Sequence, residues 1–241
     1  MAIIYEPKGK AREYAELATN IYNGCGHACK YCYAPAATFT PRDKFNNEPA
    51  PRKNILEQFE KDAIKFKGDP RSILLSFTSD LYQPINDRFK LSRLILLDMA
   101  RNNLTTTILT KGGTRACADF DILAKNKKNT FSVTLTTDNP DESLAWEPGA
   151  ALPADRIESL KEAKKLKLKT WISFEPVINP NAVMRLIRET YKFVDLYKIG
   201  KLNYHPLAKK IDWHTFLINV ESTLNRYNKP FYIKKDLELY R

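Results

Sequence analysis

The segment "TNIYNGCGHACKYCYAP", residues 19–35, gathers three of the chain's four cysteines within eight positions. It opens with the apolar and β-branched run Thr19–Tyr22, which predicts a short β-strand. Gly24 and Cys25 come next but one, so the first cysteine follows the strand closely. The segment therefore predicts a group of thiols at the carboxyl end of a strand, and it raises the question of what they hold there.

Short apolar runs alternate with stretches of helical spacing along the rest of the chain, and this alternation indicates the fold class. The helical stretches carry apolar residues three or four positions apart, as Val183, Leu186 and Ile187 do. Six β/α units in series favour parallel strands with helical crossovers. Since a closed eightfold barrel typically takes about 250 residues, we expect an α/β fold with a partial (β/α)6 barrel; a doubly wound sheet is the alternative. The five further strand-like runs are Ile73–Phe77, Thr106–Leu109, Phe131–Thr136, Thr170–Phe174 and Val194–Ile199.

The chain of 241 residues is expected to form a single domain, because no stretch rich in Pro, Gly or Ser divides it. We expect residues 17–200 to form the barrel core and residues 201–241 to add a short C-terminal extension. That extension contains one helical stretch and a β-like run at Phe231–Ile233. The polar segment Thr40–Asn54, with its three prolines, is expected to cover the cysteines.

Composition and charge narrow the class of protein. Hydrophobic residues make up 43% and charged residues 28% of the chain, which is typical of a globular protein. The N-terminus lacks a signal-peptide layout, and no run approaches the roughly 18 apolar residues of a membrane span. We therefore expect a cytoplasmic protein with no membrane partner, whose reduced cysteines act as ligands and not as disulfides. The net charge of +11, which is 39 Lys and Arg minus 28 Asp and Glu, fits either a nucleic-acid partner or a solvated basic surface.

Polar residues follow the predicted strands, at the edge where parallel β/α folds collect their functional groups. Because the carboxyl ends of parallel strands meet at one edge, we expect cysteines, hydroxyls, carboxylates and a lysine to share one rim. The residues that follow the strands are "TSDLYQP" (Thr78–Pro84), "TKGG" (Thr110–Gly113), the hydroxyls of Thr134, Thr136 and Thr137, Glu175–Pro176 and Gly200–Lys201.

The three clustered cysteines have the spacing Cys25-x3-Cys29-x2-Cys32, which lets three thiolates bind one metal centre. A [4Fe–4S] cluster usually takes four cysteines, so three would leave one iron open for a substrate or cofactor. Zinc would need a fourth protein ligand, for which His27 and Cys117 are the candidates by residue type. A third interpretation is that the cysteines bind no metal. We expect the iron–sulfur cluster.

This spacing, with the aromatic Tyr31 before the last cysteine, resembles the signature of the radical S-adenosylmethionine (radical SAM) enzymes. The segments "FTSDLYQPIN", "ILTKGG" and "LTTDNPDESLAWEPGAALPADRIESLKEAKKLKLKTWISFEPVI" are similar to the branch that contains spore photoproduct lyase, and the resemblance covers roughly Thr19 to Ile178. It implies a radical SAM-type barrel, a [4Fe–4S] cluster on the three cysteines, and S-adenosylmethionine chelated by the open iron. It also implies an electron donor of the flavodoxin or ferredoxin type and a 5′-deoxyadenosyl radical that abstracts hydrogen from a substrate.

The resemblance also assigns roles to single residues. Lys111 and Thr134 occupy positions that hold the cofactor in that branch, and Glu147 is expected to be structural. Arg156 matches an arginine that follows the "EPG" stretch; it would reach a carboxylate of the cofactor or else lie on the surface of a helix. The remaining residues expected to bind the cofactor are Ser79, Asp80, Thr136 and Glu175.

One position departs from the lyase. Where the lyase has a cysteine that returns hydrogen to the product radical, this chain has Phe77, whose ring has no S–H bond to give. We therefore expect this protein to differ from the lyase itself. Cys117 is the candidate for an alternative donor, the other interpretation being a small buried cysteine. Tyr31 and Tyr33 flank Cys32 and are candidate catalytic residues for radical transfer.

The substrate is expected to be nucleic acid or a nucleotide, as in DNA repair or modification. A radical SAM enzyme acting on a peptide or small molecule is one alternative, and a non-enzymatic metal-binding module that contacts nucleic acid is another. The five lysines of Lys161–Lys169 are expected on an outer helix, away from the rim. Residues 198–241 carry nine Lys and Arg against four Asp and Glu, a local charge of +5, and are the better candidate for a surface that faces the substrate.

Overall fold

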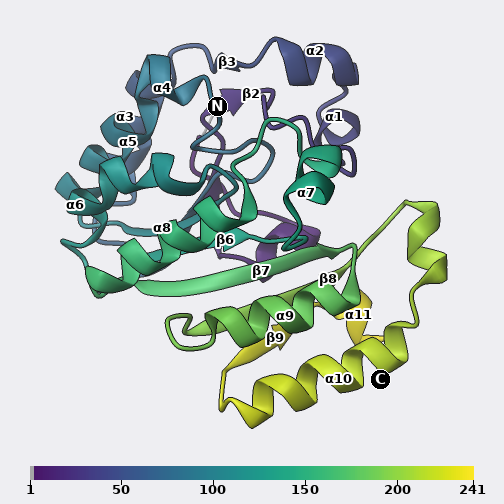
Figure 1. The fold of residues 1–241 in the computed structure, drawn as a ribbon. Helices are drawn as coiled ribbons and strands as arrows, with labels where there is room; N and C mark the ends of the chain where they lie inside the picture. Colours follow the sequence, from purple (N-terminus) through teal and green to yellow (C-terminus); the bar gives the residue numbers. More distant parts are fainter. Residues whose placement is uncertain (1–2) are drawn as a thin grey trace.

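The computed structural model describes residues 3–241 and contains one large sheet of seven parallel strands (Figure 1). The strands lie in the sheet in the order in which they occur along the chain, and every neighbouring pair is parallel. This sheet confirms the predicted α/β fold with a partial barrel of parallel strands. Its strands are β1 (Leu17–Thr19), β4 (Ser72–Leu75), β5 (Thr105–Thr110), β6 (Thr130–Thr134), β7 (Lys169–Val177), β8 (Leu196–Lys201) and β9 (Phe231–Ile233).

The sheet has one strand more than the six predicted. The additional strand is β9, the β-like run of the C-terminal extension, and it pairs with β8 through Ile199 and Ile233. The apolar run Phe231–Ile233 was visible in the sequence, but three residues do not reveal which strand they will pair with. The sheet thus includes part of the segment that the sequence assigned to the extension.

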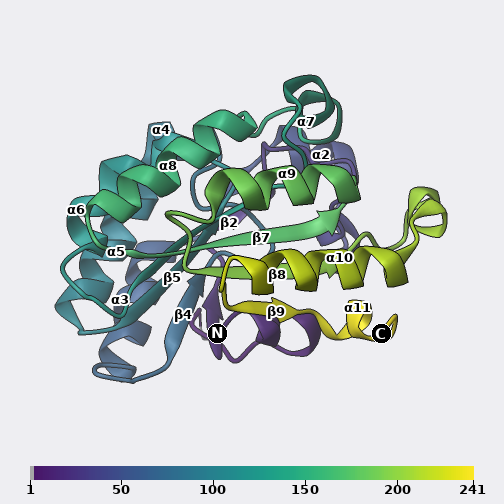
Figure 2. The same cartoon turned by 60° about the horizontal axis from the view of Figure 1, so that its bottom comes forward.

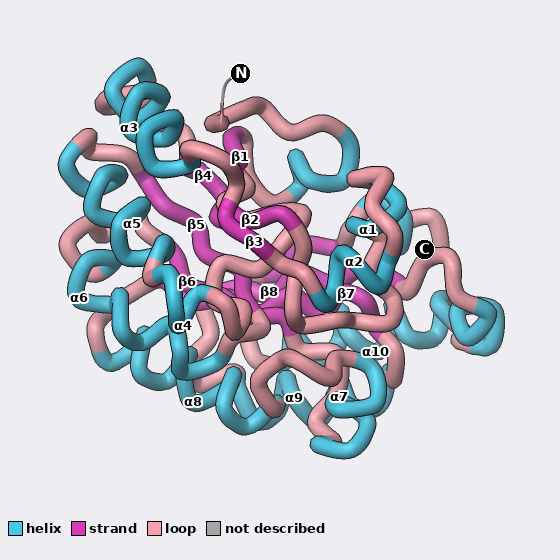
Figure 3. The backbone as a smooth tube through the Cα atoms, turned by 90° about the horizontal axis from the view of Figure 1, so that it is seen from above, coloured by secondary structure: helices cyan, strands magenta, loops and turns pink. Residues whose placement is uncertain are grey.

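Long helices follow the strands and pack on the outer face of the sheet, as Figure 3 shows for α3, α5, α8 and α9. Their apolar stripes explain this packing, because α9 buries Val183, Leu186 and Ile187, three residues of its predicted stripe. Leu94 of α5 is exposed, although it lies three positions after the buried Leu91. The outer helices are α3 (Ile55–Lys65), α5 (Leu91–Arg101), α6 (Phe120–Leu123) with the preceding 3-10 helix η2 (Gly113–Asp119), α8 (Pro153–Lys165), α9 (Pro180–Thr190) and α10 (Trp213–Arg226).

Short elements gather around the carboxyl ends of the strands. The predicted polar segment Thr40–Asn54 does lie against the cysteine loop, but it contains a helix and a strand in place of a simple loop. No helix among residues 3–241 combines the length and the apolar character that crossing a membrane requires. The short elements are β2 (Tyr22–Asn23), α1 (Ala34–Ala37), α2 (Arg42–Asn47), β3 (Ala50–Pro51), α4 (Asn86–Phe89), α7 (Pro140–Trp146), η3 (Pro206–Lys210) and α11 (Lys235–Glu238).

The N-terminal segment passes over the inner face of the sheet and joins its two edge strands. Near β1, Tyr5 forms a β-bridge with Ala18. The segment then forms the 3-10 helix η1 (Gly9–Glu13) and reaches β9, where the Tyr232 hydroxyl donates a hydrogen bond to the Glu13 carboxylate at 3.0 Å. Figure 2 shows this purple segment beside the yellow β9. The open side between β1 and β9 is therefore closed by the chain's own first residues.

Candidate active site

The three cysteines lie on the loop that follows β2, at the carboxyl edge of the sheet. All three are free thiols; Cys29 is buried, and Cys25 and Cys32 are partly exposed. Burial raises the pKa of Cys29 to about 12 and raises that of Cys25 as well. Such thiols stay protonated in a site without metal, whereas a bound metal ion or cluster holds its cysteine ligands as thiolates.

Two side chains hold this loop from one side. Gln83 accepts a hydrogen bond from the Gly26 amide at 2.7 Å and donates to the Gly24 carbonyl at 3.2 Å. The Arg42 guanidinium donates to the carbonyls of Cys29, at 3.2 Å, and Cys32, at 2.7 Å. Neither residue was identified from the sequence, although Gln83 lies only four positions after Ser79. They fix the backbone from which the thiols project.

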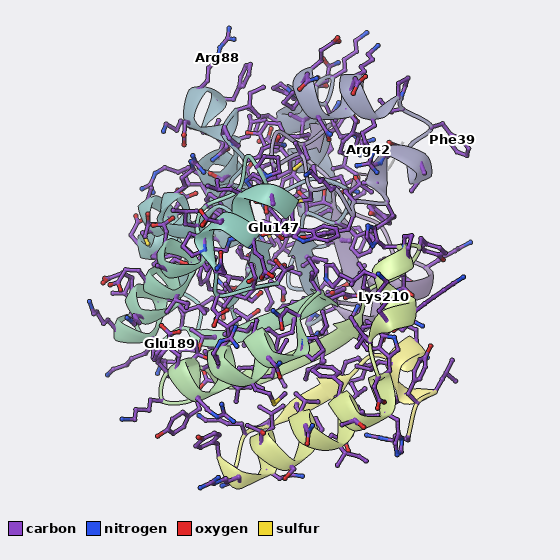
Figure 4. The ribbon with its side chains drawn as sticks, turned by 45° about the vertical axis from the view of Figure 1, so that its right-hand side comes forward. Phe39, Arg42, Arg88, Glu147, Glu189 and Lys210 are labelled. Atoms are coloured by element: carbon purple, nitrogen blue, oxygen red, sulfur yellow. The ribbon has the colours of Figure 1, made fainter. Side chains whose placement is uncertain are left out.

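A buried ion pair holds the loop from the other side. The carboxylate of Glu147 lies 2.5 Å from the Arg156 guanidinium and accepts a hydrogen bond from the Tyr31 hydroxyl. Figure 4 shows Glu147 in the interior, beneath α7. A Cβ at Gly149 would lie 2.0 Å from the Gly26 carbonyl oxygen, so only glycine permits this close approach. The "EPG" stretch therefore acts as a support for the cysteine loop.

Arg156 lies inside the protein and uses its donors there. Beside its pairing with Glu147, it donates to the carbonyls of Ala151, at 2.7 Å, and Thr134, at 2.9 Å. It is therefore not on the helix surface, which was one of the two interpretations of the sequence. Its predicted contact with the cofactor stays a prediction, since these three partners already surround the guanidinium.

Asp80 connects three parts of the carboxyl edge. Its carboxylate accepts hydrogen bonds from the Thr110 hydroxyl at 2.6 Å and the Lys111 amide at 2.7 Å, and it lies 3.4 Å from Nδ1 of His27. Burial favours the neutral acid, but His27 and these hydrogen bonds hold the pKa of Asp80 well below its ordinary value. The charged carboxylate thus ties the end of β5 to the cysteine loop.

Lys111 reaches from the end of β5 toward the cysteine loop. Its ammonium nitrogen is 5.7 Å from the centroid of the Tyr31 ring. Burial lowers the pKa of Lys111, but electrostatic interactions with Cys29 and Glu147 outweigh this effect, so the pKa is raised overall. A cation held in this place suits a carboxylate ligand beside the cysteines.

Buried polar atoms without a hydrogen-bond partner collect at this same edge. Among residues 3–241 they include the hydroxyls of Thr19 at the end of β1, Ser76 and Ser79 after β4, and Thr136 after β6, together with Nε2 of His27. Buried hydroxyls of native proteins are nearly always paired. Their gathering beside the cysteines fits a polar ligand with amino, carboxylate and ribose groups, which is the donor and acceptor set of S-adenosylmethionine.

The two residues suggested as a fourth zinc ligand lie in different places, His27 on the cysteine loop and Cys117 on η2. In the described part of the chain, no three His, Cys, Asp or Glu side chains are arranged to hold a single metal ion. Nδ1 of His27 faces the carboxylate of Asp80. Cys117 lies on η2, where burial, and to a smaller extent the carboxylates of α8, raise its pKa to about 11. Three thiolates are enough for a cluster that leaves one iron open, whereas a tetrahedral zinc ion would take a fourth protein ligand.

Glu175, on β7, contacts both the N-terminal segment and the residue that follows β9. It accepts a hydrogen bond from the Tyr14 hydroxyl and pairs with the Lys234 ammonium at 2.9 Å. A Cβ at Gly200 would lie 2.7 Å from its Cδ, so glycine there leaves the room that this carboxylate needs. The sequence did not identify Tyr14 and Lys234, because nothing local indicates that the first and last segments of the chain meet at β7. The role of Glu175 toward the cofactor stays a prediction.

The chain matches known proteins along most of its length. The family model described as the Radical SAM superfamily matches residues 19–194. An uncharacterized protein of Methanocaldococcus jannaschii is 31% identical over 194 residues, which cover 78% of this chain and 71% of that protein. Spore photoproduct lyase complexed with dinucleoside spore photoproduct has a similar fold, with a TM-score of 0.69 at 16% identity over 97% of this chain and 80% of that chain. SuiB of Streptococcus suis bound to S-adenosylmethionine has a TM-score of 0.67 at 16% identity over 90% of this chain, which spans 50% of the SuiB chain.

Proposed function

Because this chain belongs to the radical SAM superfamily, whose enzymes use a [4Fe–4S] cluster and S-adenosylmethionine, we propose that Cys25, Cys29 and Cys32 hold such a cluster here. When both groups are bound, they supply a 5′-deoxyadenosyl radical that abstracts hydrogen from a substrate. The observation that carries the proposal is the group of unpartnered buried hydroxyls beside three thiols on a loop that is held from two sides. An electron donor of the flavodoxin or ferredoxin type completes the system.

The chain's own residues divide the work of binding. Lys111 offers a cation to the carboxylate of S-adenosylmethionine, and the hydroxyls of Ser79 and Thr136 offer hydrogen bonds to its polar groups. Thr134 ends β6 in the same neighbourhood. Asp80 and the pair of Glu147 with Arg156 orient the loops and need not touch the cofactor.

We place the substrate among nucleic acids and nucleotides. The net charge of +11 supports this class, and one structural neighbour, spore photoproduct lyase, is complexed with dinucleoside spore photoproduct. A peptide or small-molecule substrate is the second candidate, since another neighbour, SuiB, is bound to its precursor peptide SuiA. Phe77 packs between the rings of Tyr14 and Tyr33, with centroids 6.2 and 5.9 Å away, so no thiol is available at that position to return hydrogen.

The test uses protein reconstituted with iron and sulfide under anaerobic conditions. With dithionite and S-adenosylmethionine we expect 5′-deoxyadenosine, and with the correct deuterated substrate we expect deuterium in that product. Single-stranded oligonucleotides, mononucleotides and peptides with deuterated sugars or side chains are compared. A fully loaded protein that never cleaves S-adenosylmethionine would favour the non-enzymatic metal-binding module and overturn the proposal.

A further inference from the structure

Exposed aromatic side chains occur in one region of the protein. The chain has 12 Phe, 12 Tyr and 3 Trp, yet among the described residues only Tyr33, Phe39 and Tyr204 are exposed, with exposed fractions of 46%, 96% and 96%. All three belong to loops at the carboxyl edge of the sheet, whereas the other exposed large apolar side chains are aliphatic. Exposed aromatic rings that gather beside a functional site mark a surface for a partner.

The loops that carry Phe39 and Tyr204 hold these rings outward in an uncommon backbone conformation. Their φ angles are 52° and 57°, in the left-handed region that bulky residues rarely adopt. The amides of Phe39 and Thr40 donate to the carbonyls of Ala36 and Pro35 at 3.2 and 3.0 Å, which fixes the first loop. Such outliers persist where the surrounding structure enforces them, often at ligand-binding sites.

The second loop is fixed by contacts on both sides of Tyr204. The ring of His205 meets the ring of Trp146 edge to face, with centroids 5.0 Å apart. The amide nitrogen of the Asn203 side chain donates to the Asp236 carboxylate at 2.8 Å. A ring on a fixed loop loses little conformational entropy when a ligand stacks on it, so it is well suited to binding.

Unpaired lysines lie on the same two loops. Between residues 196 and 211 there are four lysines and no acidic residue. Lys30 and Lys44 near the first loop, and Lys209 and Lys210 in the second, are exposed, and none of them forms an ion pair within residues 3–241. By contrast, lysines of the outer helices such as Lys61 and Lys165 pair with acidic residues on their own helix. The single acidic residue between positions 30 and 44 is Asp43.

Both loops lie at the carboxyl edge of the sheet, and Figure 4 labels Phe39 and Arg42 beside α1 and α2, and Lys210 at η3. Tyr33 lies between this surface and the inside of the barrel. Its ring is 5.9 Å from that of Phe77, which in turn is 6.2 Å from Tyr14 on the inner face. Aromatic rings thus lead from the surface toward the candidate active site.

We propose that these two loops bind single-stranded nucleic acid, with bases stacked on Phe39 and Tyr204 and phosphates bound by Lys30, Lys44, Lys209 and Lys210. Stacking tolerates any base, because every base has a π face, but it requires bases that are not already stacked in a duplex. The surface therefore selects a single strand over a duplex. The inference rests on the proposed function only in taking the bound strand as the substrate of the adjacent site.

Binding is measured by fluorescence anisotropy of labelled 20-mer oligothymidylate and oligouridylate on the reconstituted protein. Phe39→Ala and Tyr204→Ala should each weaken binding about 5- to 100-fold, the range for loss of one stacked base. Phe39→Trp and Tyr204→Phe keep the ring and should bind as the unaltered protein does. Ile64→Ala, which removes an apolar side chain that is 60% exposed on α3, is the matched control and should change nothing.

The phosphate contacts are tested by the salt dependence of binding. The double variant Lys209→Gln/Lys210→Gln should reduce the slope of log K against log salt by about 1.4, since each contact with a single strand contributes about 0.7. Lys127→Gln/Lys128→Gln removes the same charge from the exposed loop before β6, at the opposite edge of the sheet, and should leave the slope unchanged.

The result that would overturn the inference is binding of duplex and single strand with equal affinity, or unchanged affinity after both alanine substitutions. Binding of an acidic flavodoxin that depends on Phe39 and Tyr204, without binding of either oligonucleotide, would also overturn it and would assign the surface to the electron donor. Cleavage of S-adenosylmethionine by the unaltered protein is measured separately. Protein that binds the strand without cleaving the cofactor supports this inference and overturns the proposed function.

Discussion

Polar side chains at the two edges of the sheet differ in their hydrogen bonding. At the amino edge, Asn129 accepts a hydrogen bond from the Thr106 amide at 2.8 Å and donates to the Leu123 carbonyl at 3.0 Å. Asp195 there accepts from the Thr170 amide at 2.9 Å and from Lys164 at 2.5 Å. At the carboxyl edge, the hydroxyls of Ser76, Ser79 and Thr136 have no partner within residues 3–241. The side chains of Asn129 and Asp195 at the amino edge are paired internally and stabilise the fold, whereas these three hydroxyls at the carboxyl edge are available to a ligand.

The largest effect is expected from removing one of the three cysteines at the carboxyl edge. Cys25→Ala removes one of three corners that hold the proposed cluster, so we expect loss of bound iron and no detectable 5′-deoxyadenosine. Iron and sulfide analysis and product chromatography measure both. Cys117→Ala is the matched control and should keep its iron, because Cys117 lies on η2 away from the other thiols. Loss of iron from the control and not from Cys25→Ala would assign the ligands differently.

The next effect concerns the ion pair beneath the cysteine loop. Glu147→Gln leaves the Arg156 guanidinium, of which 1% is exposed, without its counter-charge, so the free energy of unfolding should fall by about 3–5 kcal/mol. Urea denaturation measures this loss. Glu158→Gln removes the carboxylate of a half-exposed pair with Lys161 on α8 and should cost less than about 1 kcal/mol. Equal losses in the two variants would contradict the structural role of Glu147.

A matched pair of substitutions compares the two edges directly. Asn129→Ala leaves the Thr106 amide and the Leu123 carbonyl unpaired, so it should lower the free energy of unfolding by about 1–3 kcal/mol. Ser79→Ala removes a hydroxyl that has no partner, so stability should not fall, while affinity for S-adenosylmethionine should. Denaturation and equilibrium dialysis with labelled cofactor measure the two quantities. A stability loss in Ser79→Ala as large as that in Asn129→Ala would remove the distinction between the edges.

The smallest effect is a pH dependence at the amino edge. Burial opposes the charge of Asp195, but hydrogen bonds from Lys164 and Thr170 hold its pKa below the ordinary value. Since the pKa is lower in the folded protein, the contribution to stability is complete above the unfolded value of about 3.9 and is lost as the pH falls through the folded value. Asp195→Asn should therefore reduce stability by less than about 1 kcal/mol at neutral pH, and by less still in acid. A difference that does not change with pH in urea titrations would count against this assignment.

The sequence predicts most of the sheet, because its strands are short apolar runs separated by helices with clear apolar stripes. Five of the six predicted runs lie within a few residues of β4, β5, β6, β7 and β8. The first run, Thr19–Tyr22, is instead shared between β1 and β2, and its residues Asn20 and Ile21 belong to neither strand. Asn20 accepts hydrogen bonds from the amides of Phe77 and Thr78, and no periodic pattern reveals such a long-range contact.

The residues of the site that directly follow strands are predictable from the sequence, whereas those contributed by segments distant in the sequence are not. Cys25, Ser79, Lys111 and Thr136 all follow strands, and the structure brings them to one edge as expected. The role of Arg42 could not be predicted, because it donates to backbone carbonyls. Every residue has a backbone carbonyl, so the sequence does not indicate which carbonyls a side chain will contact. The assignment of Ser79, Lys111 and Thr136 as ligands of the cofactor stays a prediction. The catalytic roles of Tyr31, Tyr33 and Cys117 also stay predictions.

The closure of the inner face by the N-terminal segment has a consequence for synthesis. Glu13 leaves the ribosome long before its partners Tyr232 and Lys235, which are 219 and 222 positions later in the chain. Contacts of such long sequence separation form late, because the intervening chain must be ordered first. A nascent chain that has emerged as far as β8 can assemble six strands of the sheet. The edge of β8 stays unpaired until β9 has been synthesised.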